Sequence, residues 1–477
     1  MTIATDLERY MLDLVNEFRA DNGLPPLTLE QNLNQAATTH SQWLLDNQVF
    51  THTGPVSATS PNGSTGLDRM IEAGWDQGSN WTWGENIGAE PIRNSGDFLD
   101  EVDTIFLGWV NSPGHRANLL NPDVDLLGVG IVQGILPPAS GVNVAGIMAT
   151  QNFGASNGLH DLDILGQSDA DTLTGGNGDD DIMGGAGNDL VSARFGDDFI
   201  AGGEGNDTIE SGRDNDTLEG DAGNDFLRGG AGDDEMSGGE GNDDLIGDAG
   251  NDHMTGENGQ DTLSGREGND WIDGGTGFDV LLGGSGNDTL MGGTQADNLF
   301  ASTGNDWLEG GAGFDRLFGG ADDDTLFGGD GTDALYGSAG NDQMFGEAGD
   351  DRSYGGSGND LIFSADGNDL LIGGGGFDTL EGGAGDDTLE GRFNADRFVF
   401  TDMANGFGND TITDFAATNR FERIDLGDVA AITNLNDLLN NHAQQIGADV
   451  LITAGAGSTI LLEGVDLGQL DSTDFIF

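Results

Sequence analysis

The sequence repeats every nine residues from Gly166 to Val399 without an insertion or a deletion, and the sixth residue of every unit is aspartate. The span is 234 residues, or 26 units of nine. The eighth residue is apolar in 25 of the 26 units, and Ser353 is the exception. One unit cannot bury its own apolar residue, so a register held this long indicates units stacked on one another.

The chemistry of the repeat can be followed in one unit, residues 184–192, with the sequence Gly-Gly-Ala-Gly-Asn-Asp-Leu-Val-Ser. Glycines at the first, second and fourth positions permit a turn with positive φ that aims backbone carbonyls at a common centre. The aspartate adds a hard anionic oxygen, and oxygen ligands without a softer atom favour calcium. The last three residues predict a short strand whose middle side chain is buried. Two units then make one coil of 18 residues, and the region about 13 coils.

Charge explains why a cation is needed. The formal net charge is −70, from 85 acidic residues and 15 basic residues, all of them arginine. Carboxylates stacked one coil apart repel one another, so calcium binding supplies folding energy and the calcium-free region is expected to be disordered. An acidic, glycine-rich tract that is always disordered is the alternative, but it gives no reason for an apolar residue in every unit. The charge also argues against binding to nucleic acid or to an anionic membrane.

The unit Gly-Gly-x-Gly-x-Asp-x-apolar-x resembles the calcium-binding nonapeptide of RTX proteins. The resemblance implies a parallel β-roll in which aspartates and loop carbonyls of successive coils hold Ca²⁺ between the turns. It carries over to the units with the strict motif, whose sixth residues are Asp180, Asp189, Asp207, Asp234, Asp243, Asp279, Asp288, Asp315, Asp333, Asp360, Asp378 and Asp387. Other units lack the fourth glycine, which leaves calcium binding and the continuity of the roll open at Asp169, Asp214, Gln295, Asp322 and Asn394.

The region after the repeats, residues 400–477, contains several apolar runs and ends in Asp474-Phe475-Ile476-Phe477. It resembles the C-terminal flank of RTX exoproteins, which implies an uncleaved signal recognised by the type I secretion machinery. A small β-rich C-terminal cap is expected at the same place, because the end of a solenoid exposes unpaired strand edges. Both interpretations can hold together.

Other features agree with export by such a signal. Residues 1–10 have neither the basic nor the apolar region of a secretory signal peptide. No run approaches the roughly 20 apolar residues of a membrane span. Cysteine is absent, so disulfides cannot stabilise an extracellular chain and metal ions remain as the cross-links. We therefore expect a secreted, extracellular or surface-associated protein.

The first 155 residues differ in composition and hold five of the seven tryptophans. Apolar spacing predicts helices over residues 7–18, 33–44 and 98–109, and strands over 126–132 and 143–151. Helices around a small antiparallel sheet predict an α/β domain, an α-β-α sandwich, with a linker over 156–165.

Several segments of this domain resemble the bacterial branch of the CAP superfamily, named for cysteine-rich secretory proteins, antigen 5 and pathogenesis-related 1. They are residues 14–19, 50–54, 84–87 and 109–118. The resemblance implies a cleft in which two histidines and two glutamates can hold a divalent metal, often Zn²⁺. Three of these positions are present as His52, Glu85 and His115, whereas the second glutamate falls near Asn111 or Ser112. Two imidazoles and one carboxylate can hold zinc with a water, but no carboxylate then remains as general base.

These observations predict a secreted calcium-binding protein whose β-roll folds on extracellular calcium and displays a CAP-like domain toward an extracellular ligand of unknown identity. A metal-dependent hydrolase, such as a peptidase using His52, Glu85 and His115, is one alternative. A surface or matrix protein cross-linked by calcium is the other.

Overall fold

The structure is a computed structural model. It describes residues 11–12, 15–16, 19, 24, 27–29, 37, 84–91, 126–136, 144–154, 163–166, 170–401, 406–419, 421–455 and 457–477. The chain divides into two compact units, residues 1–229 and 230–477.

The first unit begins with a four-stranded sheet of order β1-β3-β4-β2. Its strands are β1 (Thr28–Leu29), β2 (Gly84–Pro91), β3 (Leu126–Leu136) and β4 (Val144–Gly154). β4 pairs antiparallel with both β3 and β2, whereas β1 runs parallel to β3. The two strands predicted at 126–132 and 143–151 are confirmed as the longer β3 and β4. The sequence patterns did not predict β2 as a strand.

The described parts of the two first predicted helices are helical. Met11, Leu12, Val15, Asn16 and Arg19 have helical backbone, as does the buried Ala37 of the second helix. The Asn16 side chain fixes the segment that follows, because its Nδ2 donates to the Leu27 carbonyl at 3.0 Å and its Oδ1 accepts from the Leu27 amide at 2.7 Å. The helix predicted over 98–109 lies outside the described residues.

The repeats form short parallel strands. In the first unit, β7 pairs with β5 and β9, β9 with β11, and β8 with β6 and β10. The strands in chain order are β5 (Asp163–Leu165), β6 (Thr172–Thr174), β7 (Asp181–Ala186), β8 (Leu190–Phe195), β9 (Phe199–Glu204), β10 (Thr208–Arg213), β11 (Thr217–Ala222) and β12 (Phe226–Ala231). Because β5 pairs with β7 in the register of the repeats, the linker expected over 156–165 ends before Asp163.

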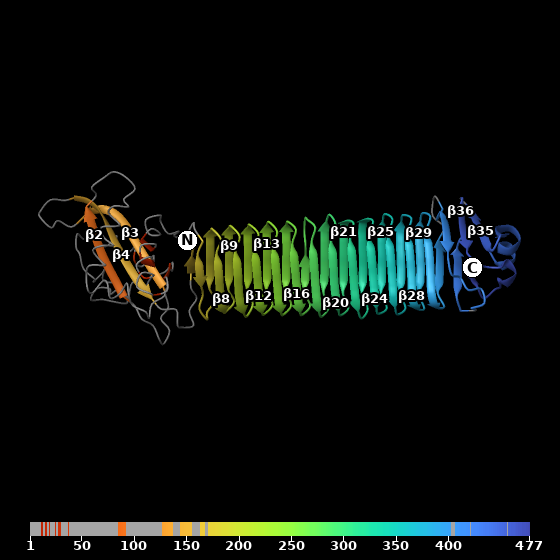
Figure 1. The fold of residues 1–477 in the computed structure, drawn as a ribbon, viewed down its shortest axis with the longest axis horizontal. Coiled ribbons are helices and arrows are strands. Elements are labelled where there is room, and N and C mark those ends of the chain that lie inside the picture. The colour runs from red at the N-terminus through yellow and green to blue at the C-terminus, as the bar shows by residue number, and fades with distance from the viewer. Residues whose placement is uncertain are drawn as a thin grey trace. The chain divides into compact units, whose positions relative to one another are not determined.

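The second unit continues the pattern, with odd-numbered strands in one sheet and even-numbered strands in the other, as β20, β24 and β28 and β21, β25 and β29 show (Figure 1). The strands are β13 (Glu235–Glu240), β14 (Asp244–Ala249), β15 (His253–Asn258), β16 (Thr262–Glu267), β17 (Trp271–Asp273), β18 (Val280–Ser285), β19 (Thr289–Thr294), β20 (Asn298–Thr303), β21 (Trp307–Gly313), β22 (Arg316–Ala321), β23 (Thr325–Gly331), β24 (Ala334–Ala339), β25 (Gln343–Ala348), β26 (Arg352–Ser357), β27 (Leu361–Asp366), β28 (Leu370–Gly376), β29 (Thr379–Ala384), β30 (Thr388–Asn394) and β31 (Arg397–Thr401).

Neighbouring strands of a sheet are offset by 18 residues, as in Leu281↔Leu299 and Leu299↔Leu317. The expected coil of two nonapeptides is therefore confirmed, and residues 164–398 form a parallel β-solenoid. The eighth side chain of each unit points inward and is buried, with Ser353 in the same place as its apolar counterparts. These inward columns are the core of the solenoid.

The units without the fourth glycine do not interrupt the second unit's strands. Gln295, Asp322 and Asn394 adopt the left-handed backbone that glycine has elsewhere, with φ of 79°, 79° and 81°. Aspartate and asparagine accept this conformation readily, and for glutamine it costs about 1–2 kcal/mol. The strands on either side keep their register, so pairing with the neighbouring coils compensates this cost.

Residues after β31 close the solenoid. β32 (Asn409–Ile412) pairs with β30, β33 (Arg423–Asp428) pairs with β31, and the short β37 (Phe475–Ile476) adds to β33. β36 (Ser458–Leu462) runs parallel to β32 and antiparallel to β35 (Asp449–Gly455), which pairs with β34 (Ala443–Ile446). Short helical turns complete the cap: α6 (Leu435–Asp437), η1 (Leu438–His442) and η2 (Leu467–Gln469). The predicted β-rich cap is confirmed, and it buries Asp474 and Phe475 of the proposed signal.

Nowhere in the described part of the chain is there a helix with both the length and the apolar character needed to cross a membrane.

Candidate calcium sites

The turns place the sixth-position aspartates in columns, one above another. At most positions of the columns, the Oδ1 atom of the aspartate accepts a hydrogen bond from the backbone amide of the aspartate 18 residues earlier, as from Asp297 to Asp315 and from Asp315 to Asp333, both at 2.8 Å. The same bond recurs between coils along both units. One carboxylate oxygen therefore ties each turn to its neighbour, and the other oxygen remains for a ligand.

All twelve aspartates of the strict motif are buried, with at most 3 % of the residue exposed. For many aspartates of the columns the second oxygen, Oδ2, is buried and accepts no hydrogen bond from any described residue. They are Asp189, Asp198, Asp207, Asp252, Asp261, Asp270, Asp279, Asp288, Asp297, Asp306, Asp315, Asp324, Asp333, Asp342, Asp351, Asp360, Asp369, Asp378 and Asp387. A buried carboxylate oxygen without a donor is strongly unfavourable, so a cation or a proton has to compensate it.

The glycine that begins most units leaves room beside this oxygen. A Cβ atom added to Gly274 would lie 2.7 Å from Asp279 Oδ2 and 2.9 Å from the carbonyl oxygen of Gly292 in the next coil. At Gly310 the corresponding distances are 2.8 Å to Asp315 Oδ2 and 2.6 Å to the Gly328 carbonyl oxygen. Two acceptors from successive coils thus face one small space. This donor set of carboxylate and carbonyl oxygens suits calcium.

Within the described residues, no three histidine, aspartate or glutamate side chains gather as a metal-binding group. Calcium takes six to eight oxygen ligands. Carbonyl oxygens of the glycine-rich turns therefore have to supply much of the coordination of any calcium bound here.

Burial raises the pKa of the column carboxyls. The loss of hydration is the main cause, and it raises the pKa of Asp315 to about 6, that of Asp297 to about 7 and that of Asp351 to about 8. The amide of the preceding coil opposes this shift, whereas neighbouring aspartates of the column add to it for Asp297 and Asp351. In the absence of metal, a carboxyl such as that of Asp351 therefore holds a proton near neutral pH, whereas that of Asp315 is mostly ionised there.

The strict motif proves too narrow as a guide to these columns. Asp297, whose unit has Gln295 in place of the fourth glycine, is as buried as Asp315 and makes the same amide contact. Asp410 also continues a column, accepting from the Asp387 amide at 3.1 Å across a spacing of 23 residues instead of 18. The sequence Asn-Asp-Thr-Ile at 409–412 is identical to residues 206–209 of the repeats and is the signal that identifies it.

A second polar ladder, which the sequence reasoning missed, runs beside the aspartate columns. Side chains at the fifth position accept from the fifth-position amide of the following coil, as from Asn287 to Asn269 at 2.6 Å and from Asn305 to Asn287 at 2.9 Å. This direction is opposite to that of the aspartate bonds. The frequent asparagine at the fifth position is its signal in the sequence.

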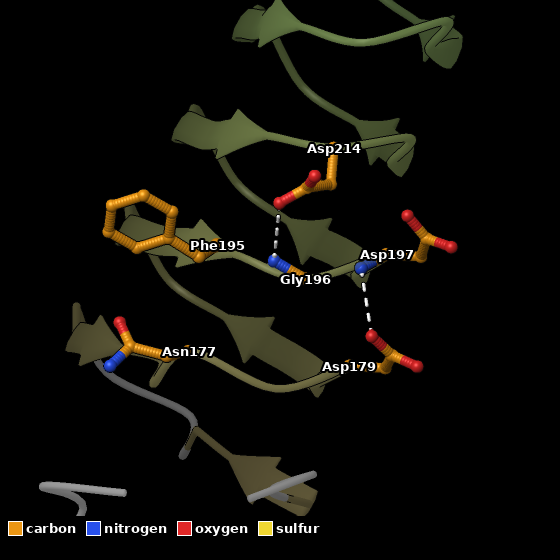
Figure 2. Close-up of a pocket in the computed structure, with 6 residues that line it drawn as sticks. All are labelled: Asn177, Asp179, Phe195, Gly196, Asp197 and Asp214. Carbon is orange, nitrogen blue, oxygen red and sulfur yellow. Dashed lines mark hydrogen bonds between the residues drawn. The ribbon is translucent and has the colours of Figure 1, made fainter. Parts of the chain in front are cut away.

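The same ladder borders a surface pocket in the first unit. Figure 2 shows the Asp197 amide donating to Asp179 Oδ1 at 3.0 Å and the Gly196 amide donating to Asp214 Oδ2 at 3.3 Å. Asn177 and Phe195 complete the lining. These carboxylates satisfy turn amides, so the pocket is a consequence of the ladder and not a separate acidic site.

The predicted zinc ligands cannot be compared in the same way. His52 and His115 lie outside the described residues, as do Asn111 and Ser112. The backbone of Glu85 is in β2, where it pairs with Asn152 of β4. The zinc cleft stays a prediction.

Comparison with known proteins finds two families, which match different parts of the chain. Residues 12–134 match the cysteine-rich secretory protein family, CAP. Nine overlapping or adjoining matches to the RTX calcium-binding nonapeptide repeat together cover residues 163–398.

Relatives of the N-terminal region come from Bacillus. The uncharacterized protein YkwD of Bacillus subtilis is 33 % identical over 126 residues, which is 26 % of this chain and 42 % of that protein. The uncharacterized membrane protein YlbC of the same species is 34 % identical over 129 residues, 27 % of this chain and 32 % of that protein. The chain thus spans less than half the length of either relative.

A solved structure, an extracellular protein containing an SCP domain from Bacillus anthracis, is 28 % identical, with a TM-score of 0.23 over 32 % of this chain and 45 % of that one.

The repeats imply calcium binding, and the matches to both families lie where the sequence motifs predicted them. The chain therefore combines an N-terminal CAP domain with an array of RTX calcium-binding repeats.

Proposed function

We propose that this is a secreted protein in which extracellular calcium folds the solenoid, and the folded solenoid presents the CAP domain to an extracellular ligand. The observation that carries the proposal is the column of buried Oδ2 atoms without a hydrogen-bond donor. Calcium at these atoms would compensate the carboxylates and link successive coils. Because the unfolded chain holds no such site, binding and folding are one process.

A calcium titration of the full chain tests the proposal. Strand content measured by circular dichroism should rise cooperatively with calcium, in the roughly 0.1–1 mM range typical of extracellular modules. Isothermal titration should show binding over the same range, and magnesium at equal concentration should be a poor substitute because its octahedral shell is less adaptable. Equal strand content in chelator and in calcium would overturn the proposal.

Export is the second part of the proposal. The cap buries Asp474 and Phe475, and such a segment is accessible to a secretion channel only before the chain folds. Low intracellular calcium would keep the repeats unfolded until the chain leaves the cell. Inactivating the type I channel of the host should retain the protein inside the cell, and undiminished secretion would refute this route.

A further inference from the structure

One face of the second unit lacks acidic residues, although the chain as a whole carries 85 of them. Six successive even-numbered strands, β18, β20, β22, β24, β26 and β28, contain no aspartate or glutamate. The flanking strands β16 and β30 of the same sheet carry Glu267 and Glu390. We call the outward side of these six strands the acid-free face.

The opposite sheet provides a contrast over the same coils. Five of its strands, β21, β23, β25, β27 and β29, each contain an acidic residue, and β19 is the one strand of this sheet in these coils that does not. The acid-free face is therefore not a general property of the repeat. It is a local feature of one sheet, in a molecule whose charge otherwise keeps copies apart.

The acid-free face carries two outward columns, because the seventh and ninth residues point away from the buried eighth. The ninth-position column is Leu282, Phe300, Phe318, Tyr336 and Tyr354, and its last member, Ile372, is buried. The seventh-position column is Val280, Asn298, Arg316, Ala334, Arg352 and Leu370. One column is therefore bulky and apolar, and the other is smaller or cationic.

The aromatic rings of the ninth-position column stack face to face along the sheet. Phe300 and Phe318 are 4.8 Å apart with an interplanar angle of 6°, and Tyr336 and Tyr354 are 5.0 Å apart at 3°. Phe318 and Tyr336 join the two pairs at 4.7 Å. Each ring thus covers the faces of its neighbours and leaves its edge outward. A sugar, which stacks on ring faces, finds no exposed ring face along this column.

We propose that the acid-free face is the contact between two copies of this chain, related by a two-fold axis parallel to the direction in which the strands stack. Such a rotation keeps each strand at its own level and reverses its direction. The seventh column of one copy then faces the ninth column of its partner. Arg316 then lies opposite the edge of the partner's Phe318, and Arg352 opposite the edge of the partner's Tyr354, where the aliphatic parts of the arginine side chains pack against the rings.

The sizes of the side chains also complement one another. At the central strand β24, Ala334 faces the partner's Tyr336, so a small residue lies opposite a large one. No carboxylate of either copy is placed within the six paired strands. Both halves of the contact are the same surface, as a two-fold interface requires. The contact uses this face of both copies, so the assembly stops at a dimer. Cross-linking by calcium, in contrast, has no such limit on the number of copies.

The size of the face predicts a moderate affinity. Six strands about 4.8 Å apart and six residues of about 3.3 Å each give roughly 29 by 20 Å, on the order of 600 Å² per copy. This is somewhat less than the roughly 800 Å² per partner of a standard interface. We therefore expect association at micromolar protein concentrations.

Sedimentation velocity of the full chain in saturating calcium tests the proposal. The wild type should shift from monomer to dimer across micromolar concentrations. The double variant Phe318→Asp/Tyr336→Asp should remain monomeric, because it places carboxylates in the centre of the contact. Arg316→Ala should weaken the dimer by roughly three- to tenfold, because the aliphatic part of the arginine no longer packs against the partner's Phe318.

The matched control is Phe327→Asp/Phe345→Asp on the opposite sheet, where the two rings stack in the same way at 4.8 Å. It should dimerise like the wild type, and circular dichroism should show that both double variants still fold with calcium. A wild type that stays monomeric, or two double variants that lose the dimer equally, would overturn the proposal. So would a monomer that binds phosphatidylcholine vesicles through these same residues.

Discussion

The solenoid and its C-terminal cap use aspartate in opposite ways. In the solenoid, Asp297 and Asp351 are buried, each keeps an oxygen without a donor, and loss of hydration raises the pKa of both. In the cap, Asp437 accepts from Asn441 Nδ2 at 2.7 Å and from the Thr433 amide at 3.1 Å. These bonds hold the pKa of Asp437 below its usual value, the Asn441 bond being the largest cause.

The difference shows which part of the protein depends on a ligand. The cap satisfies exposed carboxylates such as that of Asp437 with its own donors, although Asp474 Oδ1 is buried without one, and it packs an apolar core that includes Val450, Ile452 and Ile460. The solenoid has an equally buried apolar core but leaves its turn carboxylates incomplete. Calcium dependence should therefore reside in the turns and not in the packing of the interior.

Removal of calcium should have the largest effect. One site held at a hundred times its dissociation constant stabilises the fold by about 2.7 kcal/mol. A series of such sites exceeds the roughly 5–15 kcal/mol by which a whole domain is stable. Chelation should therefore abolish most of the strand signal in circular dichroism, and hydrogen exchange should become fast throughout residues 170–396. Amides of the solenoid that stay protected from exchange in chelator would contradict the idea that the solenoid depends on calcium.

Single aspartates should differ between the two regions. Asp315→Asn removes the charge from a buried column position and should raise the calcium concentration at the folding midpoint, with a loss of about 1–3 kcal/mol at fixed calcium. The matched variant in the cap is Asp471→Asn, because Asp471 is exposed and its Oδ1 accepts from the Thr473 amide and hydroxyl. Its midpoint should equal that of the wild type. Equal shifts for both variants would show that the column position has no special role.

Much of the solenoid was predictable because its period is a local property of the chain. The aspartate and the apolar residue recur at fixed offsets, and these offsets define the coil and the inward column. The continuity through Gln295 was not predictable, since it depends on neighbouring coils holding a glutamine in left-handed backbone. The column position of Asp410 was missed because a five-residue offset breaks the period, although the strand pairing continues.

Other features depend on contacts that a single unit does not contain. The opposite directions of the aspartate and asparagine ladders arise only when coils stack. The acid-free face becomes visible only when every second unit is aligned, because alternate units belong to different sheets. The zinc cleft rests on family resemblance, since His52 and His115 are far apart in sequence and lie outside the described residues.

Acidity should affect the calcium-free and calcium-bound solenoids in opposite directions. The folded-state pKa values of Asp315 and Asp351, about 6 and about 8, lie above the unfolded value of 3.8. Protonation therefore favours the folded state, and the contribution is lost as pH rises through about 6 to 8. In chelator, strand content should increase as the pH is lowered toward 5. In calcium, the same change should raise the folding midpoint, because protons compete for the carboxylates. A midpoint independent of pH would contradict the assignment of these carboxyls as ligands.

The smallest effect is expected inside the solenoid, at the one polar residue of the inward column. Ser353 is fully buried, its register partners are Leu335 and Leu371, and its Oγ accepts or donates no hydrogen bond among the described residues. Ser353→Val replaces this hydroxyl by methyl groups and should stabilise the calcium-bound protein by about 1–2 kcal/mol in urea unfolding.

Leu335→Ala removes apolar volume from the neighbouring coil of the same column. It should lower the free energy of unfolding by about 2–5 kcal/mol. Neither substitution alters a turn carboxylate, so the direct calcium ligands remain intact in both. The magnesium discrimination and the pH dependence of folding should therefore stay as in the wild type, even though stability moves in opposite directions. If Ser353→Val destabilised the protein, a buried water bound to the hydroxyl would have to be part of the core. The interior, like the turns, would then depend on a bound group to satisfy a polar atom.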